Sequence, residues 1–306
     1  MAALLVTLAL SPAPARAAEA RPVAYSGTGA WIDRYDFRRL TDPDAVAADM
    51  AAHGVNTLYL ETASWKVPRR VDIVAPAQTR ELIAAAHANG MTVVAWYLPG
   101  LKDLRTDFRR VRAALAFRTP DGQGFDSFAL DIEANVVNPL SRRNAALLEL
   151  SRLIRAEVGR SYELGAIVPD QLSTSAGNVL WPSFPYAATA KYYDAFLPMA
   201  YSTLNRARGA ARVYRYTAAN VRFVRAATGR PVHLIGGLTN AMTRAEQAAA
   251  VHAARDAGAI GTSLYKYPLY DRGSWAALGA FGPDQDLTTV PVTVFSQRSI
   301  SPRAAR

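Results

Sequence analysis

The sequence repeats one short unit: an alanine-rich amphipathic segment, a glycine, and then a short apolar run. Five such junctions carry the glycines Gly54, Gly90, Gly159, Gly229 and Gly258, which precede the apolar runs at 56–60, 92–96, 164–168, 232–235 and 260–264. Glycine readily takes the left-handed conformation that ends a helix, and nearly continuous apolar strands are typical of parallel sheets buried on both faces. The pattern therefore predicts helices that alternate with buried parallel strands.

Three further apolar runs, at 29–32, 127–133 and 195–201, bring the number of expected strands to eight. Eight strand–helix units over about 250 residues are typical of a (β/α)₈ (TIM) barrel. Helix starts are also marked, by Asp42-Pro43 and by Thr243 with Glu246 three residues later. The alternative is an open doubly wound sheet, but no glycine-rich phosphate loop follows the first strand. We therefore expect a single-domain α/β TIM barrel over residues 24–281.

The two ends of the chain differ from this pattern. Ala2–Leu10 is apolar but too short to span a bilayer, and a small-residue motif follows at Ala15-Arg16-Ala17. These features predict a signal peptide over residues 1–20 with cleavage near Ala17, and hence a secreted, extracytoplasmic protein. Residues 282–306 lack helical periodicity and end in a basic stretch, so we expect a disordered basic tail.

The amino-acid composition limits the kinds of binding partner that we expect. The chain has no cysteine, which excludes disulfides and thiolate chemistry, and it carries a formal net charge of +10. The arginines are scattered over the predicted helices, so we expect no nucleic-acid binding. Because the apolar run Ala2–Leu10 is too short to span a bilayer, we also expect no integral membrane segment. The charge leaves two interpretations open: electrostatic association with anionic cell-wall polymers, or a basic surface without a partner.

The most chemically specific motif is Asp131-Ile132-Glu133, at the end of the apolar run 127–133. Residues i and i+2 of a strand point to the same face, so the two carboxylates are expected to project together. Two neighbouring acids should have pKa values that are pushed apart. This arrangement is what glycoside hydrolysis requires.

The active site of a (β/α)₈ barrel lies at the carboxyl ends of its strands. Acids and aromatic residues gather at these predicted ends, where aromatic faces can stack on sugar rings. Lys266, between two tyrosines, is instead expected to point outward between strand and helix. The residues expected to bind or convert a sugar are Asp33, Glu61, Trp96, Tyr97, Asp131, Glu133, Met199, Tyr201, Tyr265 and Tyr267.

Other chemistries are poorly supported. His53, His87 and His233 fall at the predicted starts of strands, on the face opposite the expected site, and His252 lies within a helix. We therefore expect no metal site and no cofactor. A serine triad is also disfavoured, because the sequence has no Gly-x-Ser-x-Gly motif.

The segment 125–133 resembles the strand-four signature of the family 18 (chitinase-like) glycoside hydrolases, Asp-Gly-x-Asp-x-Asp-x-Glu. Asp126, Asp131 and Glu133 match its first, third and fourth acids. The segment 196–201, which ends in Met199-Ala200-Tyr201, is similar to the Met-x-Tyr motif of strand six in that family.

The resemblance implies substrate-assisted catalysis, which needs no protein nucleophile. Glu133 would be the general acid, and Asp131 would orient the substrate's 2-acetamido group as it attacks the anomeric carbon. Tyr201 would hydrogen-bond the same group. The match also places Asp126 and Met199 among the substrate-binding positions.

Several positions depart from the family pattern: Ala129 replaces the second acid, Ser127 replaces the glycine, and Ser202 stands where Asp or Asn is usual. The Asp-x-Glu ending is also similar to that of the family 25 lysozymes. We predict a secreted hydrolase that cleaves a β-linked N-acetylated glycan, either chitin-like or peptidoglycan. The alternative is a catalytically eroded barrel that acts as a glycan-binding or cell-surface scaffold.

Overall fold

The computed structural model describes residues 22–175, 180–205 and 207–282, in which eight parallel strands close into a barrel with neighbours in chain order. The strands are β1 (Gly27–Ile32), β2 (Thr57–Ser64), β3 (Thr92–Leu98), β4 (Ser127–Asp131), β5 (Leu164–Pro169), β6 (Ala195–Met199), β7 (His233–Leu238) and β8 (Gly261–Tyr265). The expected α/β barrel is confirmed, and the open doubly wound sheet is wrong. The expected leader over 1–20 lies outside the described residues, as does the expected tail from residue 283 onward.

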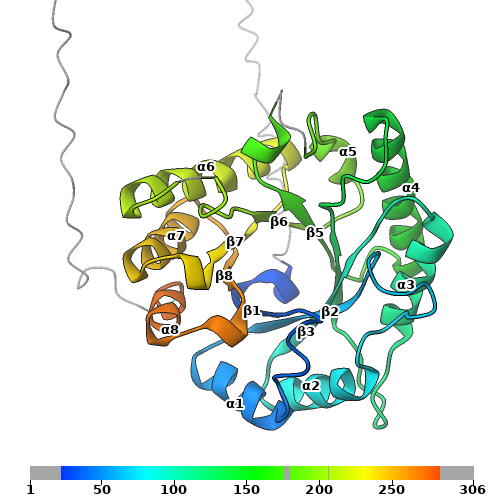
Figure 1. Ribbon diagram of the computed structural model, residues 1–306, viewed down its shortest axis with the longest axis horizontal. Coiled ribbons are helices and arrows are strands. Elements are labelled where there is room, and N and C mark those ends of the chain that lie inside the picture. Colours follow the sequence, from blue (N-terminus) through cyan, green and yellow to red (C-terminus); the bar gives the residue numbers. More distant parts are fainter. Residues whose placement is uncertain (1–21, 176–179, 206, 283–306) are drawn as a thin grey trace, which may run out of the picture.

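Helices surround the barrel as an outer ring (Figure 1). They are α1 (Pro43–Ala52), α2 (Pro76–Ala88), α3 (Leu104–Ala116), α4 (Leu140–Val158), α5 (Tyr186–Thr189), α6 (Ala210–Thr228), α7 (Arg244–Asp256) and α8 (Arg272–Gly279). Short 3₁₀ helices add η1 (Val23–Tyr25), η2 (Leu172–Thr174), η3 (Thr239–Ala241) and η4 (Tyr267–Leu269). No helix among the described residues is long and apolar enough to cross a membrane.

The predicted helix ends are confirmed. All five junction glycines have positive φ, between 66° and 77°, in the region that other residues rarely occupy. At the start of α1, the Asp42 side chain accepts a hydrogen bond from the Ala45 N–H, and Pro43 takes the first helical position. At the start of α7, Thr243 and Glu246 form a reciprocal capping box.

Large aromatic side chains fill the barrel interior toward the amino ends of the strands. Tyr25 and Tyr59 are fully buried there, and two glycines, one on β1 and one on β5, make room for their rings. A Cβ added at Gly29 would lie 2.6 Å from the Tyr59 ring, and one at Gly165 would lie 2.6 Å from the Tyr25 ring. The barrel is therefore a packed core that supports whatever lies above it.

Candidate active site

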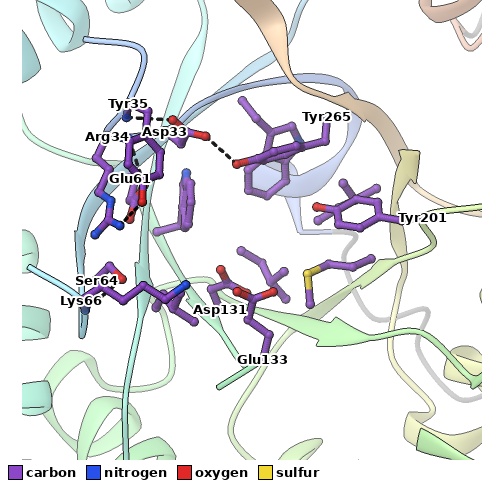
Figure 2. Close-up of a pocket in the computed structure, with 16 residues that line it drawn as sticks. Asp33, Arg34, Tyr35, Glu61, Ser64, Lys66, Asp131, Glu133, Tyr201 and Tyr265 are labelled. Carbon is purple, nitrogen blue, oxygen red and sulfur yellow. Dashed lines mark hydrogen bonds between the residues drawn. The ribbon is translucent and has the colours of Figure 1, made fainter. Parts of the chain in front are cut away.

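A cavity of about 190 Å³ opens at the carboxyl ends of the strands (Figure 2). Every strand contributes to its lining, as the barrel prediction requires. The lining residues are Trp31, Asp33, Arg34, Tyr35, Glu61, Ser64, Lys66, Trp96, Leu98, Asp131, Glu133, Ile167, Met199, Tyr201, Ile235 and Tyr265.

Asp131 and Glu133 both face this cavity, so the expected same-face projection is observed. Asp131 is only 7% exposed, and its Oδ1 has no hydrogen-bond partner. Burial raises the pKa of Asp131 well above its usual value, and the charges of Glu133 and Glu61 add to the effect. Burial also raises the pKa of Glu133, while the Lys66 ammonium opposes that rise. The pair therefore holds protons to a higher pH than ordinary carboxyl groups do.

Glu61 supplies a third buried carboxylate, from β2. It is 4% exposed, and its Oε2 accepts a hydrogen bond of 2.9 Å from the Arg34 N–H. Burial raises the pKa of Glu61 to about 7. Because its charge also raises the pKa of Asp131, the acids of β2 and β4 interact electrostatically at the cavity.

A β-bulge in β2 changes which residues enter the cavity. Glu61 pairs with Trp96 of β3, but the next pairing joins Ala63 to Tyr97, so one residue is inserted between them. Before the bulge, odd-numbered residues face inward; after it, Ser64 and Lys66 line the cavity. Bulges of this kind are frequent beside active sites, where they redirect side chains.

A buried ionic cluster joins the ends of β1 and β8. The Lys266 ammonium donates to Asp33 and to Asp36, both at 2.7 Å, and the Tyr265 hydroxyl donates to Asp33 at 2.8 Å. Burial alone would raise the pKa of Asp33, but the hydrogen bonds from Lys266 and Tyr265 lower it. Lys266 does not line the cavity, and its ammonium group is held by these two aspartates, which follow β1.

Aromatic rings form the floor and one wall of the cavity. Trp31 stacks on Tyr59 with ring centroids 4.1 Å apart and an interplanar angle of 9°, and Trp96 meets Trp31 edge-on at 6.0 Å. Tyr201 lies beside Tyr265 at 5.9 Å. The Trp96 Nε1–H is buried and has no acceptor.

The structure brings eight of the expected site residues together and places three elsewhere. Those in the cavity are Asp33, Glu61, Trp96, Asp131, Glu133, Met199, Tyr201 and Tyr265. Tyr97 alternates with Trp96 and donates to Asp107 on the outer side of the sheet. Asp126 precedes β4 and accepts hydrogen bonds from His87 and the Val93 N–H, at the opposite end of the barrel. Tyr267 lies past β8 and donates to Asp49 of α1.

The remaining lining residues differ in how clearly the sequence marks them. Trp31, Ile167 and Ile235 could have been found, because strict alternation along their strands places them inward. Ser64 and Lys66 carry no such signal, since the bulge reverses the alternation. The described residues contain no group of three or more His, Asp or Glu side chains placed to hold a metal ion.

Comparisons with known proteins agree on the architecture. No protein-family model and no curated protein matches the sequence. Solved structures do match: an endo-β-1,4-mannanase from Thermotoga petrophila has a TM-score of 0.64 at 12% identity, covering 86% of this chain and 77% of that one. The spore cortex-lytic enzyme SleL of Bacillus cereus has a TM-score of 0.62 at 10% identity, covering 84% and 74%.

A GH18 chitinase from Cycas revoluta in complex with (GlcNAc)₃ is also similar, with a TM-score of 0.61 at 12% identity over 84% of this chain and 99% of that one. At such low identity these matches establish the fold. The protein is a (β/α)₈ barrel whose fold is similar to that of these glycoside hydrolases.

Proposed function

We propose that this protein hydrolyses a β-linked N-acetylated glycan in the cavity at the carboxyl ends of the strands. The observation that carries the proposal is the Asp131–Glu133 pair, in which Asp131 is buried and Glu133 is half-buried. Both face the cavity and lie with Tyr201 around one space (Figure 2). Burial keeps the pKa of Glu133 raised, which suits a group that must donate a proton.

The chemistry follows from these positions. Glu133 gives its proton to the glycosidic oxygen as the bond from the anomeric carbon breaks and its electrons pass to that oxygen. The carbonyl oxygen of the 2-acetamido group attacks the anomeric carbon, and a water molecule later opens the resulting ring as Glu133 takes the proton back. Asp131 accepts a hydrogen bond from the acetamido N–H, and Tyr201 donates one to its carbonyl oxygen.

The unpaired Oδ1 of Asp131 supports an acetamido-bearing substrate. A buried carboxylate oxygen without a donor is unfavourable, and a ligand N–H would supply the missing hydrogen bond. The similar structures include chitinases and a cortex-lytic enzyme, one of them in complex with (GlcNAc)₃. They support the same class of substrate without identifying it.

The experiment is a measurement of product release from chitin oligosaccharides and peptidoglycan by the wild type, Glu133→Gln and the control Glu149→Gln. Glu149 is a half-buried residue of α4 that does not line the cavity. Glu133→Gln keeps the shape of the side chain but has no proton to donate, so we expect a loss of about 100-fold or more. The control should behave like the wild type. A Glu133→Gln variant that turns over normally rules out the assignment, and so does a wild type that releases no product.

A non-catalytic glycan-binding scaffold is the second candidate, and Ala129 favours it. Ala129 lies in the barrel interior, two residues before Asp131 on the same face, and offers it no polar partner. The family 18 signature has an acid at this position. Saturable oligosaccharide binding without product, from a panel on which a control enzyme works, would support the scaffold.

We also propose that the protein is secreted through its N-terminal leader. Outside the cell it would associate electrostatically with anionic cell-wall polymers. The net charge of +10 supports the association. Such binding should weaken steeply as ionic strength rises. Association that persists in about 0.5 M salt, where the screening length falls to a few ångströms, would exclude charge as its cause.

A further inference from the structure

Basic and hydrogen-bond-donating groups gather on the cavity wall that is built from the ends of β1 to β3. Arg34 follows β1, and the β2 bulge turns Ser64 and Lys66 into the cavity. Figure 2 shows the Lys66 side chain crossing the mouth toward Asp131. The Lys66 charge is therefore close enough to the acid pair to act on both acids electrostatically.

Lys66 has a charge without a close counterion among the described residues. No carboxylate there lies within 4.0 Å of its ammonium group, in contrast to Lys266, which has two. The nearest aromatic contact is Trp65, with the ammonium 5.8 Å from the ring centroid. Lys66 is also exposed, so its charge is available to a ligand that enters the mouth.

A second, independent observation lies deeper on the same wall. Trp96, on the neighbouring strand β3, is 6% exposed, and its Nε1–H has no acceptor. A buried donor left unpaired costs about 1–3 kcal/mol. An acceptor oxygen on a bound molecule would satisfy it.

We propose that the sugar bound in this cavity carries an acidic substituent, a carboxylate, which lies against the β1–β3 wall with Lys66 as its counterion. Trp96 Nε1–H and the Ser64 hydroxyl are the neutral donors available beside it. The inference rests on the proposed glycan-hydrolysing function and deepens it, because it selects an acidic glycan over a neutral one. A neutral chitin-like chain would leave the Lys66 charge unused.

The competing role for Lys66 is to balance the charge of the acid pair. Its ammonium group opposes the rise that burial causes in the pKa of both Asp131 and Glu133. A balancing charge would affect every substrate equally. Recognition of a carboxylate affects acidic substrates selectively. The ratio of kcat/KM for an acidic and a neutral substrate separates the two roles, because any common effect cancels in the ratio.

The test compares two disaccharide substrates that differ only by a 3-O-lactyl carboxylate, one with N-acetylmuramic acid and one with N-acetylglucosamine. We expect the wild type to prefer the acidic substrate and Lys66→Met to reduce that preference about tenfold or more, as loss of a charge-assisted hydrogen bond predicts. The matched control is Lys191→Met, an exposed lysine outside the cavity, which should keep the wild-type ratio.

A third substrate with a uronic acid in place of the lactyl-bearing sugar identifies the source of the carboxylate. Preference for either acidic substrate, lost in Lys66→Met, supports the inference. Equal use of acidic and neutral substrates by the wild type, or a ratio that Lys66→Met leaves unchanged, overturns it. In both of those outcomes Glu133-dependent hydrolysis stands, whereas cleavage of no substrate removes the proposed function and this inference together.

Discussion

Glu61 illustrates how a side chain's surroundings set its chemistry. It follows an apolar strand run in the sequence, a position that also suits a helix-capping glutamate, yet the barrel encloses it so that only 4% is exposed. One hydrogen bond from the Arg34 N–H does not compensate for the loss of water, and burial raises its pKa to about 7. Glu61 therefore changes charge close to neutral pH, beside the acids of β4.

This raised pKa predicts a pH-dependent effect on stability. Because the folded state binds the Glu61 proton more tightly than the unfolded chain does, its contribution to the free energy of unfolding falls as pH rises from about 4.5 to about 7. Glu61→Gln removes that dependence. The free energy of unfolding of the variant, compared with that of the wild type, should therefore rise between pH 4 and pH 8. The upper limit of this rise is on the order of 3 kcal/mol.

Urea unfolding of both proteins at the two pH values measures this difference. Groups that do not interact with Glu61 titrate alike in the two proteins and cancel, so the difference reports Glu61 together with its coupling to Asp131. A difference in unfolding free energy that stays constant with pH would show that Glu61 titrates normally.

Among the elements, β1 and β8 are joined by more than their backbone ladder. Lys266 follows β8 and binds Asp33 and Asp36, which follow β1, and both aspartates are buried. The cluster thus fixes the loops on either side of the seam where the barrel closes. It also orients Tyr265, whose hydroxyl donates to Asp33 in the cavity.

Replacing this lysine should be costly. Lys266→Met leaves two buried carboxylates without their counterion, and breaking a buried ion pair in this way typically costs 3–5 kcal/mol. We expect a loss of about 3 kcal/mol or more in the free energy of unfolding at pH 7, measured by urea denaturation. Lys191→Met, at an exposed site, should change it by about 0.5 kcal/mol or less, and a similarly small change in Lys266→Met would contradict a stabilising role.

The elements were predictable because their signals are local. Apolar runs located all eight strands, and Gly54 or Gly229 marked helix ends whose φ values are positive in the structure. The paired acids were predictable for the same reason, since alternation along one strand fixes the relative direction of Asp131 and Glu133.

Other parts of the site depend on contacts that no local pattern records. The β2 bulge reverses the alternation and brings Lys66 into the cavity. Asp126 matched a family signature by spacing, yet its position before β4 places it at the far end of the barrel, against His87. Lys266 finds its partners across a separation of more than two hundred residues, which only closure of the barrel creates.

In the whole molecule, the closed barrel concentrates side chains from all eight strands at one end, above an interior packed with aromatic rings. Three acids with raised pKa values, two basic residues and several aromatic rings then surround one cavity. A small polar substrate with hydroxyl and amide groups fits such a lining better than an apolar ligand does. The central claim is that Glu133 donates the proton that releases the leaving group.

The most direct test compares two leaving groups in the wild type and Glu133→Gln. A natural oligosaccharide needs its glycosidic oxygen protonated, whereas an aryl glycoside with an acidic phenol leaves without a proton. The account predicts that Glu133→Gln lowers kcat/KM for the oligosaccharide about 100- to 10,000-fold and lowers it far less for the aryl glycoside. Equal losses on both substrates, or no loss on the oligosaccharide, would contradict the assignment of Glu133 as the general acid.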